Sequence, residues 1–297
     1  MNWMKYRLVY FLISTFAIGI GIFGLIKWGL LFGVDFKGGA IIEYLLPREI
    51  STEEATRAIE NNGVSVTSIQ RTETSYLIKV PPISGDEKDR IFAALENIAG
   101  GKPEELRFEN VGPSIGPDLI KKTFWAMGIA AISILFWVAI QFKSLKFGIS
   151  AILAMTHDSL VLVGSFSLLG HFFGAEVDFL FVTAALTVLS FSVHDTIVVY
   201  DRIRESQRKY GGELIDLVNR AVTETMVRSL NNSFTIIFML VALVLLGGST
   251  IKWFAIALLI GTISGTYSSP FVAVPVLVTW DELQKKEAKE LKFSKSP

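Results

Sequence analysis

The chain has 297 residues, of which 51% are hydrophobic and 19% are charged, and its 28 basic and 28 acidic residues cancel to zero net charge. Its mean hydropathy of +0.48, together with several apolar runs of roughly twenty residues, excludes an ordinary water-soluble globular protein. The absence of cysteine excludes disulfides, a thiolate nucleophile and iron–sulfur ligation. The composition is typical of an integral membrane protein.

The apolar runs predict six transmembrane helices. The first is expected to be a retained anchor, because it is too long for a signal peptide and has no small-residue cleavage site. The last run is longer than a bilayer needs, so we expect Pro270 or Pro275 to kink it or to end its membrane part. The predicted spans are 8–31, 123–142, 147–171, 177–200, 233–248 and 253–280.

The polar stretch 33–122, between the first two spans, predicts a small folded domain. Ser51 begins the first expected helix as an N-cap, with Glu54 three residues on. The order β-α-β-β-α-β is that of the ferredoxin-like split βαβ fold, and an irregular loop is the alternative. The expected strands are 40–46, 64–71, 75–80 and 106–111, and the expected helices are 51–62 and 85–98. The fold class is therefore an α-helical integral membrane protein with six transmembrane helices and a small α+β ferredoxin-like extracytoplasmic domain.

Lysine and arginine set the expected orientation, because they concentrate in the connections on one side of the spans. The turn "GHFFGAEVD" on the other side has neither residue. Both termini are therefore predicted to be cytoplasmic, in the inner (cytoplasmic) cell membrane. The basic residues that carry this prediction are Lys5, Arg7, Lys143, Lys146, Arg202, Arg204, Arg208, Lys209, Arg220, Arg228, Lys285, Lys286, Lys289, Lys292 and Lys295.

The expected organisation has four parts. They are an N-terminal tail with the first transmembrane helix (1–32), the extracytoplasmic domain (33–122), a five-helix transmembrane bundle (123–280) and a basic cytoplasmic tail (281–297). Apolar residues at helical spacing also predict a cytoplasmic amphipathic helix near 213–226. It is expected either to lie on the membrane surface or against a partner, or to pack under its own bundle.

Among the ionisable residues inside or at the edge of the predicted bilayer, three stand out: Asp158 in the third span, Asp195 in the fourth and Arg228 before the fifth. A charge at a helix centre costs on the order of 3 kcal/mol, so such groups face the bundle interior, pair or stay neutral. A buried carboxyl near a movable arginine can load and release a proton. The alternative is a permanent pair of Asp195 with Arg228 or Arg202 that only holds helices together.

The spacing of polar residues predicts a supporting polar track. Ser192 and Asp195 share one face of the fourth span, at i and i+3. On the fifth span a single polar stripe is formed by Arg228, Asn231, Asn232 and Thr235. If those faces meet, Arg228 approaches Asp195.

Other kinds of site are not indicated. His157 and His194 each precede an aspartate, but neighbours on a helix differ by about 100° in direction, so neither "HD" is expected to chelate a metal. No phosphate-binding glycine loop is present, and no cofactor or nucleic acid is expected. Gly261 and Gly265 are spaced as in GxxxG, which predicts close helix packing.

Five ordered motifs resemble one known family, the SecF subunit of the SecDF protein-export complex, within the resistance-nodulation-division superfamily. They are "GVDFKGG", "ENVGPSIG", "THDS", "SVHDTIVVYDRIRE" and "RSLNNS". The likeness covers nearly the whole chain. His194 stands where the family more often has asparagine, so the role of this histidine is open.

The resemblance implies a non-enzymatic auxiliary subunit that pairs with a SecD-like subunit, associates with the SecYEG channel and uses the proton-motive force to help preproteins leave on the outer side. In that family the residues matching Asp195 and Arg228 belong to the proton pathway, and Asp158 is carried over with them. Membrane lipid is the surrounding medium. A hinge between bundle and outer domain is expected at Gly33, Asp35, Gly38, Gly39, Gly112, Pro113 and Gly116.

Two alternatives remain at this stage. A small-molecule or lipid exporter of the same superfamily usually has two six-helix halves and larger outer domains, whereas this chain has one half. A purely structural assembly subunit needs no titrating group. Carboxylates serve protons and sodium ions alike, so the coupling ion stays open.

Overall fold

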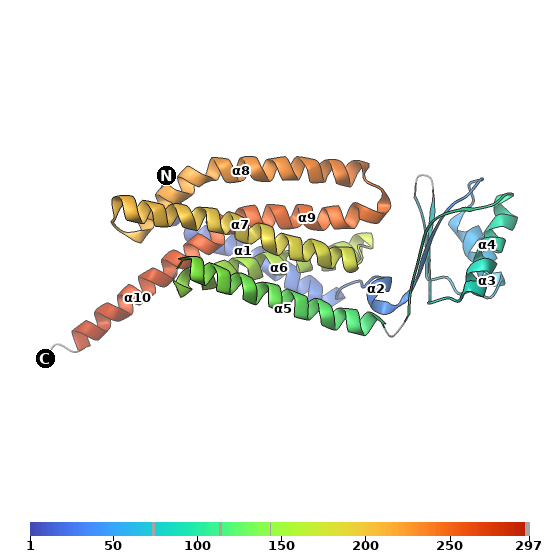
Figure 1. Ribbon diagram of the computed structural model, residues 1–297, viewed down its shortest axis with the longest axis horizontal. Coiled ribbons are helices and arrows are strands. Elements are labelled where there is room, and N and C mark those ends of the chain that lie inside the picture. The colour runs from blue at the N-terminus through green and yellow to red at the C-terminus, as the bar shows by residue number, and fades with distance from the viewer. Residues whose placement is uncertain (73–74, 113–114, 143, 295–297) are drawn as a thin grey trace. The chain divides into compact units, whose positions relative to one another are not determined.

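The computed structural model describes residues 1–72, 75–112, 115–142 and 144–294. The chain forms two compact units (Figure 1). One consists of Met1–Leu31 and Ala126–Pro297, and the other of Phe32–Trp125. The first is helical, and the second combines helices with a small antiparallel sheet.

Six helices in the described part of the chain are long and apolar enough to cross a membrane, which confirms the six predicted spans. The helical elements are the 3₁₀ turn η1 (Trp3–Tyr6), α1 (Arg7–Trp28), α5 (Ile115–Phe142), α6 (Leu145–Phe173), α7 (Phe179–Tyr210), α8 (Leu214–Leu246), α9 (Ser249–Ser268), the π-turn η2 (Ser269–Ala273) and α10 (Val274–Ser294).

Helix α8 differs from the expectation of a separate amphipathic helix near 213–226 followed by a span at 233–248. The two segments form one uninterrupted helix of 33 residues, because no glycine or proline lies between its ends. Its first part packs against its own bundle rather than standing free. The buried apolar residues of that part are Leu217, Val218, Ala221 and Val222.

The long last span changes its winding where the sequence places Pro270. Residues Ser269–Ala273 form a π-turn between α9 and α10. Proline has no N–H to donate, so the regular i→i−4 ladder is interrupted there. Pro275 lies in the first turn of α10, where proline is tolerated.

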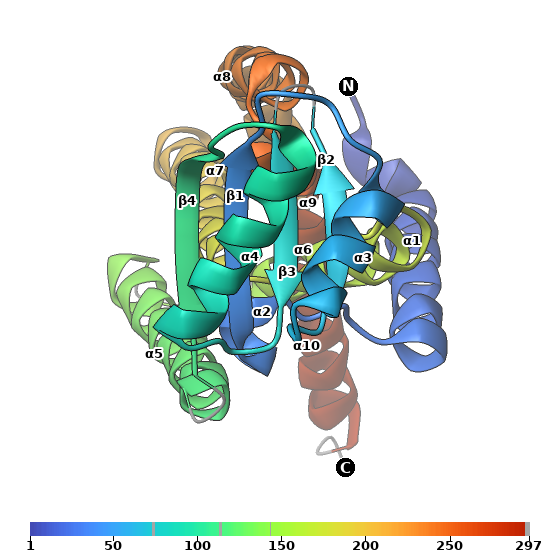
Figure 2. The same cartoon turned by 90° about the vertical axis from the view of Figure 1, so that its right-hand side faces the viewer.

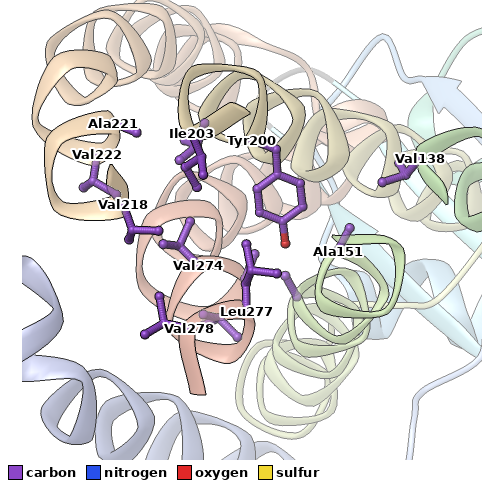
Figure 3. Close-up of a cluster of buried hydrophobic side chains, with 14 of the residues drawn as sticks. Val138, Ala151, Tyr200, Ile203, Val218, Ala221, Val222, Val274, Leu277 and Val278 are labelled. Atoms are coloured by element: carbon purple, nitrogen blue, oxygen red, sulfur yellow. The ribbon is translucent and has the colours of Figure 1, made fainter. Parts of the chain in front are cut away.

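One apolar cluster joins the ends of the helices in the first unit (Figure 3). The aromatic ring of Tyr200 on α7 is fully buried in it, among the side chains of Ala151 and Leu277. Val222 of α8 and Val274 of α10 belong to the same cluster. This packing fixes α7, α8 and α10 relative to one another.

Small residues bring several helix pairs into close contact. Gly21 of α1 faces the backbone of Gly164 on α6, so that a side chain at either position would clash. Gly261 of α9 lies against Val188 of α7, and Gly265 lies against Ser192 of the same helix. Membrane helices commonly pack in this way.

The second unit contains the six elements expected within 33–122, in the expected order. They are β1 (Gly39–Leu45), α3 (Thr52–Asn61), β2 (Ser68–Arg71), β3 (Tyr76–Val80), α4 (Gly85–Ala99) and β4 (Glu104–Val111), preceded by a short helix α2 (Val34–Lys37) that was not predicted. The sheet order is β2-β3-β1-β4, and every neighbouring pair is antiparallel.

Helices α3 and α4 lie side by side over one face of this sheet (Figure 2). Alternate residues of β1 point into that core, and Ala40, Ile42 and Tyr44 are fully buried. The hydroxyl of Ser51 accepts a hydrogen bond from the Glu54 N–H, which confirms the predicted cap of α3.

The expected hinge residues lie at both ends of the second unit. Gly33 caps α2, and Asp35 lies within it. Gly38 and Gly39 have φ angles of 77° and 146°, conformations that favour glycine. Gly116 lies so close to the carbonyl of Phe36 that no side chain fits, so the segments entering and leaving the unit touch. Gly112 follows β4 in open space, and Pro113 lies outside the described residues.

Candidate functional site

Two buried aspartates mark the interior of the helical unit. Asp158 on α6 has no exposed surface, and Asp195 on α7 is 3% exposed. Charged groups in such surroundings need hydrogen bonds or ion partners. The two carboxyls are satisfied in different ways.

Asp158 accepts hydrogen bonds from four side chains. Ser192 of α7 and Ser268 of α9 donate to Oδ2, at 2.5 and 2.6 Å. Ser264 of α9 donates to Oδ1 at 2.6 Å, and Nδ1 of His157 lies 3.0 Å from the same oxygen. A single carboxyl thus joins α6, α7 and α9.

Asp195 has a single hydrogen-bond donor among the described residues. The hydroxyl of Ser229 on α8 donates to its Oδ2 at 2.5 Å, and Ser229 is itself 9% exposed. His194, the neighbour of Asp195, is exposed on α7. The two members of this "HD" therefore point in different directions, as expected from the helical rotation per residue.

Hydroxyl groups continue from Asp158 into the π-turn. Ser192, which donates to Asp158, offers its own carbonyl oxygen to the hydroxyls of Thr196 and Ser269, at 3.0 and 3.3 Å. Those two hydroxyls lie 3.0 Å apart. The fourth span is thereby linked both to the Asp158 carboxyl and to η2.

Arg228 lines an open pocket of about 320 Å³ between α7 and α8. The lining includes Thr225, one turn before Ser229 on α8, and Val198, three residues after Asp195 on α7. The pocket therefore lies beside the Asp195–Ser229 pair, toward the C-terminal end of α7 and the N-terminal end of α8. Its residues are Val198, Asp201, Arg202, Glu205, Glu224, Thr225 and Arg228.

Neither arginine considered for Asp195 pairs with it among the residues that the structure describes. Arg202 is engaged with carboxylates, because its Nε lies 2.5 Å from Glu224 and its Nη1 lies 2.6 Å from Glu205. Arg228 is exposed and has no ion pair there. Arg228 therefore lines the pocket without a carboxylate partner in the described part of the chain.

The predicted polar stripe on α8 borders α7 through its first residue, Arg228, at the pocket, and its other residues are not turned inward. Consecutive residues differ by about 100° around a helix, and packing turns Ser229 and Ser233 inward. The stripe is consequently exposed on the surface of this chain, at Arg228, Asn231, Asn232 and Thr235. Ser192 is buried as expected, but it bonds Asp158 rather than Asp195.

Three hydroxyl partners were not predicted: Ser229, Ser264 and Ser268. Ser264 and Ser268 belong to the run of small residues around Gly261 and Gly265, which indicates close helix packing. The same run also supplies hydrogen-bond donors to Asp158, because close packing brings the serine hydroxyls near the carboxyl. Their i, i+4 spacing is the one signal that places both on a single face.

The described residues contain no group of three or more histidine, cysteine, aspartate or glutamate side chains that could hold a metal ion. His157 and Asp158, although adjacent in sequence, do bond each other through Nδ1 and Oδ1. The helical rotation between neighbouring residues argues against His157 and Asp158 binding one metal ion together. The Asp158 carboxyl can nevertheless reach the imidazole of His157 beside it.

The fold and these residues define a multi-pass membrane protein whose helical bundle carries ionisable groups in its interior. Comparison with known proteins gives the family. Residues 91–283 match the family model described as protein export membrane protein SecD/SecF, C-terminal. The chain belongs to this family, on its SecF branch.

Relatives and solved structures agree with this assignment. The chain is 40% identical to the protein translocase subunit SecF of Thermobaculum terrenum, over 94% of this chain and 93% of that one. It is 31% identical to the SecDF of Bacillus subtilis, over 95% of this chain and 38% of that one. The crystal structure of SecDF from Thermus thermophilus, a translocon-associated membrane protein, matches with a TM-score of 0.81 and 30% identity, over 95% of this chain and 39% of that chain. The chain is a SecF-like auxiliary subunit of the Sec translocase.

Proposed function

We propose that the chain, with a SecD-like partner, uses the proton-motive force to promote protein export across the cytoplasmic membrane. The observation that carries the proposal is the pair of Asp195 and Ser229, buried but within one helical turn of the open pocket that Arg228 lines. An acid in that position can exchange protons with water while remaining inside the bundle.

In this proposal Asp195 binds the transported proton and Arg228 responds to its charge. When Asp195 is ionised, the free guanidinium of Arg228 is attracted toward it, and when Asp195 is neutral, that attraction is lost. Asp158 also belongs to the proposed pathway. Each proton that crosses 100 mV supplies about 2.3 kcal/mol, so a few protons shift a two-state equilibrium by several kcal/mol.

The second unit is proposed to be a ferredoxin-like extracytoplasmic domain, covering 33–122. The element order and the strand order β2-β3-β1-β4 support that fold. The distribution of lysine and arginine supports cytoplasmic termini, an inner-membrane location, a basic cytoplasmic tail at 281–297 and a bundle formed by 1–32 and 123–280. The touching segments at Gly116 and Phe36 support a hinge there.

The proposed partners are a SecD-like subunit, the SecYEG channel, translocating preproteins and membrane lipid; no catalytic reaction is assigned. The polar stripe on α8 supports the SecD-like partner. Asn231, Asn232 and Thr235 are exposed on a span, where polar groups are unfavourable against lipid. Another protein surface covering them removes that cost. In the SecDF of Bacillus subtilis, the matching region is 38% of a longer chain.

Reconstituted vesicles test the proposal. With the SecYEG channel and the SecD-like subunit present, export under a pH gradient should be stimulated by the wild-type chain and not by Asp195→Asn, which assembles normally but cannot exchange a proton. Thr183→Ala, at an exposed hydroxyl on the same helix, is the matched control. Stimulation by Asp195→Asn at the wild-type level, or by a sodium gradient alone, would overturn proton coupling at this residue.

A further inference from the structure

His157 holds a polar atom that the packing leaves without a partner. The imidazole is 6% exposed, and its Nδ1 is bonded to Asp158. Its Nε2 is buried and has no hydrogen-bond partner among the described residues. Buried polar atoms are nearly always paired, so such an exception points to a function or to an exchangeable ligand.

The protonation pattern around Asp158 follows from its donors. A carboxylate offers about four lone-pair positions, and each oxygen of Asp158 already accepts from two groups: Ser192 and Ser268 at Oδ2, Ser264 and His157 at Oδ1. Nδ1 of His157 must therefore carry a hydrogen, because a lone pair there would face the carboxylate. The open position for one more proton is Nε2.

The spacing of α1 and α6 places a second buried hydroxyl, that of Ser14, at the level of this imidazole. The α1 and α6 helices run parallel, because Gly21 meets Gly164 and Gly24 meets Ser167. Ser14 lies seven residues before Gly21, and His157 lies seven before Gly164, so two helical turns bring both to the same level of the same interface. The Ser14 hydroxyl is buried, has no hydrogen-bond partner at standard distance and angle among the described residues, and interacts with the hydroxyl of Tyr267.

Tyr267 of α9 supports this placement. Its ring centroid lies 6.1 Å from that of His157, and its hydroxyl donates to the carbonyl of Tyr10, one turn before Ser14 on α1. The single hydroxyl hydrogen of Tyr267 is therefore engaged. Among the described residues, the titratable groups in contact with the imidazole are Asp158 on α6 and Tyr267 on α9.

We propose that His157 binds an exchangeable proton at Nε2, with the Ser14 hydroxyl accepting a hydrogen bond from the resulting N–H. The incoming proton adds to the Nε2 lone pair and yields an imidazolium, while Nδ1–H continues to donate to Asp158 Oδ1; release restores the neutral ring. Asp158 keeps its charge and its three serine donors throughout. The role in transport rests on the proposed proton-driven function, whereas the binding of the proton does not.

Nitrogen NMR on the full chain in lipid bilayers tests the proposal. The sequence has three histidines, at positions 157, 171 and 194, so His171→Gln and His194→Gln assign the signal of His157. When the pH is lowered, His157 should pass from the neutral form with its hydrogen on Nδ1 to imidazolium. Ser14→Ala should weaken proton binding about fivefold, by removing one hydrogen bond. A ring that stays neutral, or that carries its hydrogen on Nε2 at high pH, overturns the proposal.

Variants separate this site from Asp195. His157→Asn keeps an amide donor near the Nδ1 position but cannot take up a proton, so the pH-driven stimulation of export should fall at least tenfold while assembly is retained; unchanged stimulation overturns the role in transport. In Asp195→Asn the titration of His157 should persist, because the two groups do not touch. Normal proton-driven export by Asp195→Asn would therefore contradict the proposed function, whereas a His157 ring that takes up no proton would contradict the proton site at His157.

Discussion

The hydroxyl of Ser229 donates to Oδ2 of Asp195 at 2.5 Å, so the residue beside Arg228, and not Arg228 itself, contacts the buried acid. Arg228 instead lines the neighbouring pocket, exposed and without an ion pair among the described residues. Ser229 and Arg228, which are adjacent on α8, therefore have different roles. One residue stabilises the carboxylate, and the other brings positive charge close to water.

Ser229→Ala tests the first of these tasks. A hydrogen bond to a charged group contributes about 1.5–3 kcal/mol, so the ionised state of Asp195 loses that stabilisation and proton-driven export should fall about tenfold. The measurement is export by vesicles at a fixed pH gradient. Thr183→Ala, at an exposed hydroxyl on α7, serves as the control and should leave the rate within a factor of two. Equal rates for both variants would contradict the assignment.

The two acids should differ in their importance for folding. Asp158→Asn places an amide against four donors and leaves some of them unsatisfied, at about 1–3 kcal/mol each. Asp195→Asn disturbs a single hydroxyl. Thermal unfolding of the purified proteins should therefore show a clearly larger loss for Asp158→Asn. A larger loss for Asp195→Asn would contradict the hydrogen-bond arrangement.

Gly261 should tolerate no side chain. A methyl group there overlaps Val188 on α7, and overpacking of this kind typically costs about 1–3 kcal/mol. Gly261→Ala should lower the midpoint of thermal unfolding. Gly128→Ala on α5 is the matched control, because a methyl group at Gly128 meets nothing within 4 Å; there, better helix propensity should leave stability unchanged or improved. Equal effects would argue against close packing of α9 on α7.

The caps of α3 and α4 should respond differently to acid. Hydrogen bonds from the Ser84 backbone and hydroxyl hold the pKa of Glu87 below its usual value. A folded-state pKa that is lowered stabilises the fold above the unfolded pKa of about 4.3. This stabilisation disappears as the pH falls through the lowered pKa. Acid should therefore loosen the start of α4.

Hydrogen exchange of the first turn of each helix measures the effect. Ser84→Ala should speed exchange in α4 at neutral pH, and the difference from wild type should shrink below about pH 4. The cap of α3 consists of one hydrogen bond, which the Ser51 hydroxyl accepts from the Glu54 N–H. The reciprocal bond from the cap residue to a glutamate carboxylate is described only for α4. Ser51→Ala should speed exchange in α3 by an amount that changes little with pH. A pH-independent effect at Ser84 would contradict the reciprocal bond.

The spans, the order of elements in the second unit and the Ser51 cap could be predicted because local pattern decides them. Hydropathy over twenty residues marks a span wherever it lies. Alternation and turn residues separated the strands from the helices, although strand ends shifted, as with β2, which begins at Ser68 rather than 64. The packing of glycines was likewise visible from their spacing.

The partners of the two acids could not be predicted, because they depend on how helices rotate against one another. Arg228 and Ser229 are equally plausible from spacing, and they differ by about 100° on α8. Tertiary packing of Val222 and Ser233 decides which of them turns inward. The continuity of α8 was missed for a related reason, since polar residues near Arg228 resemble a boundary although nothing there breaks a helix.

The unbroken α8 has a mechanical consequence. At 1.5 Å per residue its 33 residues measure about 50 Å, against a hydrocarbon thickness of about 30 Å. Ser229 is the sixteenth residue of the 33 from Leu214, close to the midpoint. A helix held at its middle acts as a rigid lever: a tilt of about 10° around Ser229 moves each end by about 4 Å, in opposite directions.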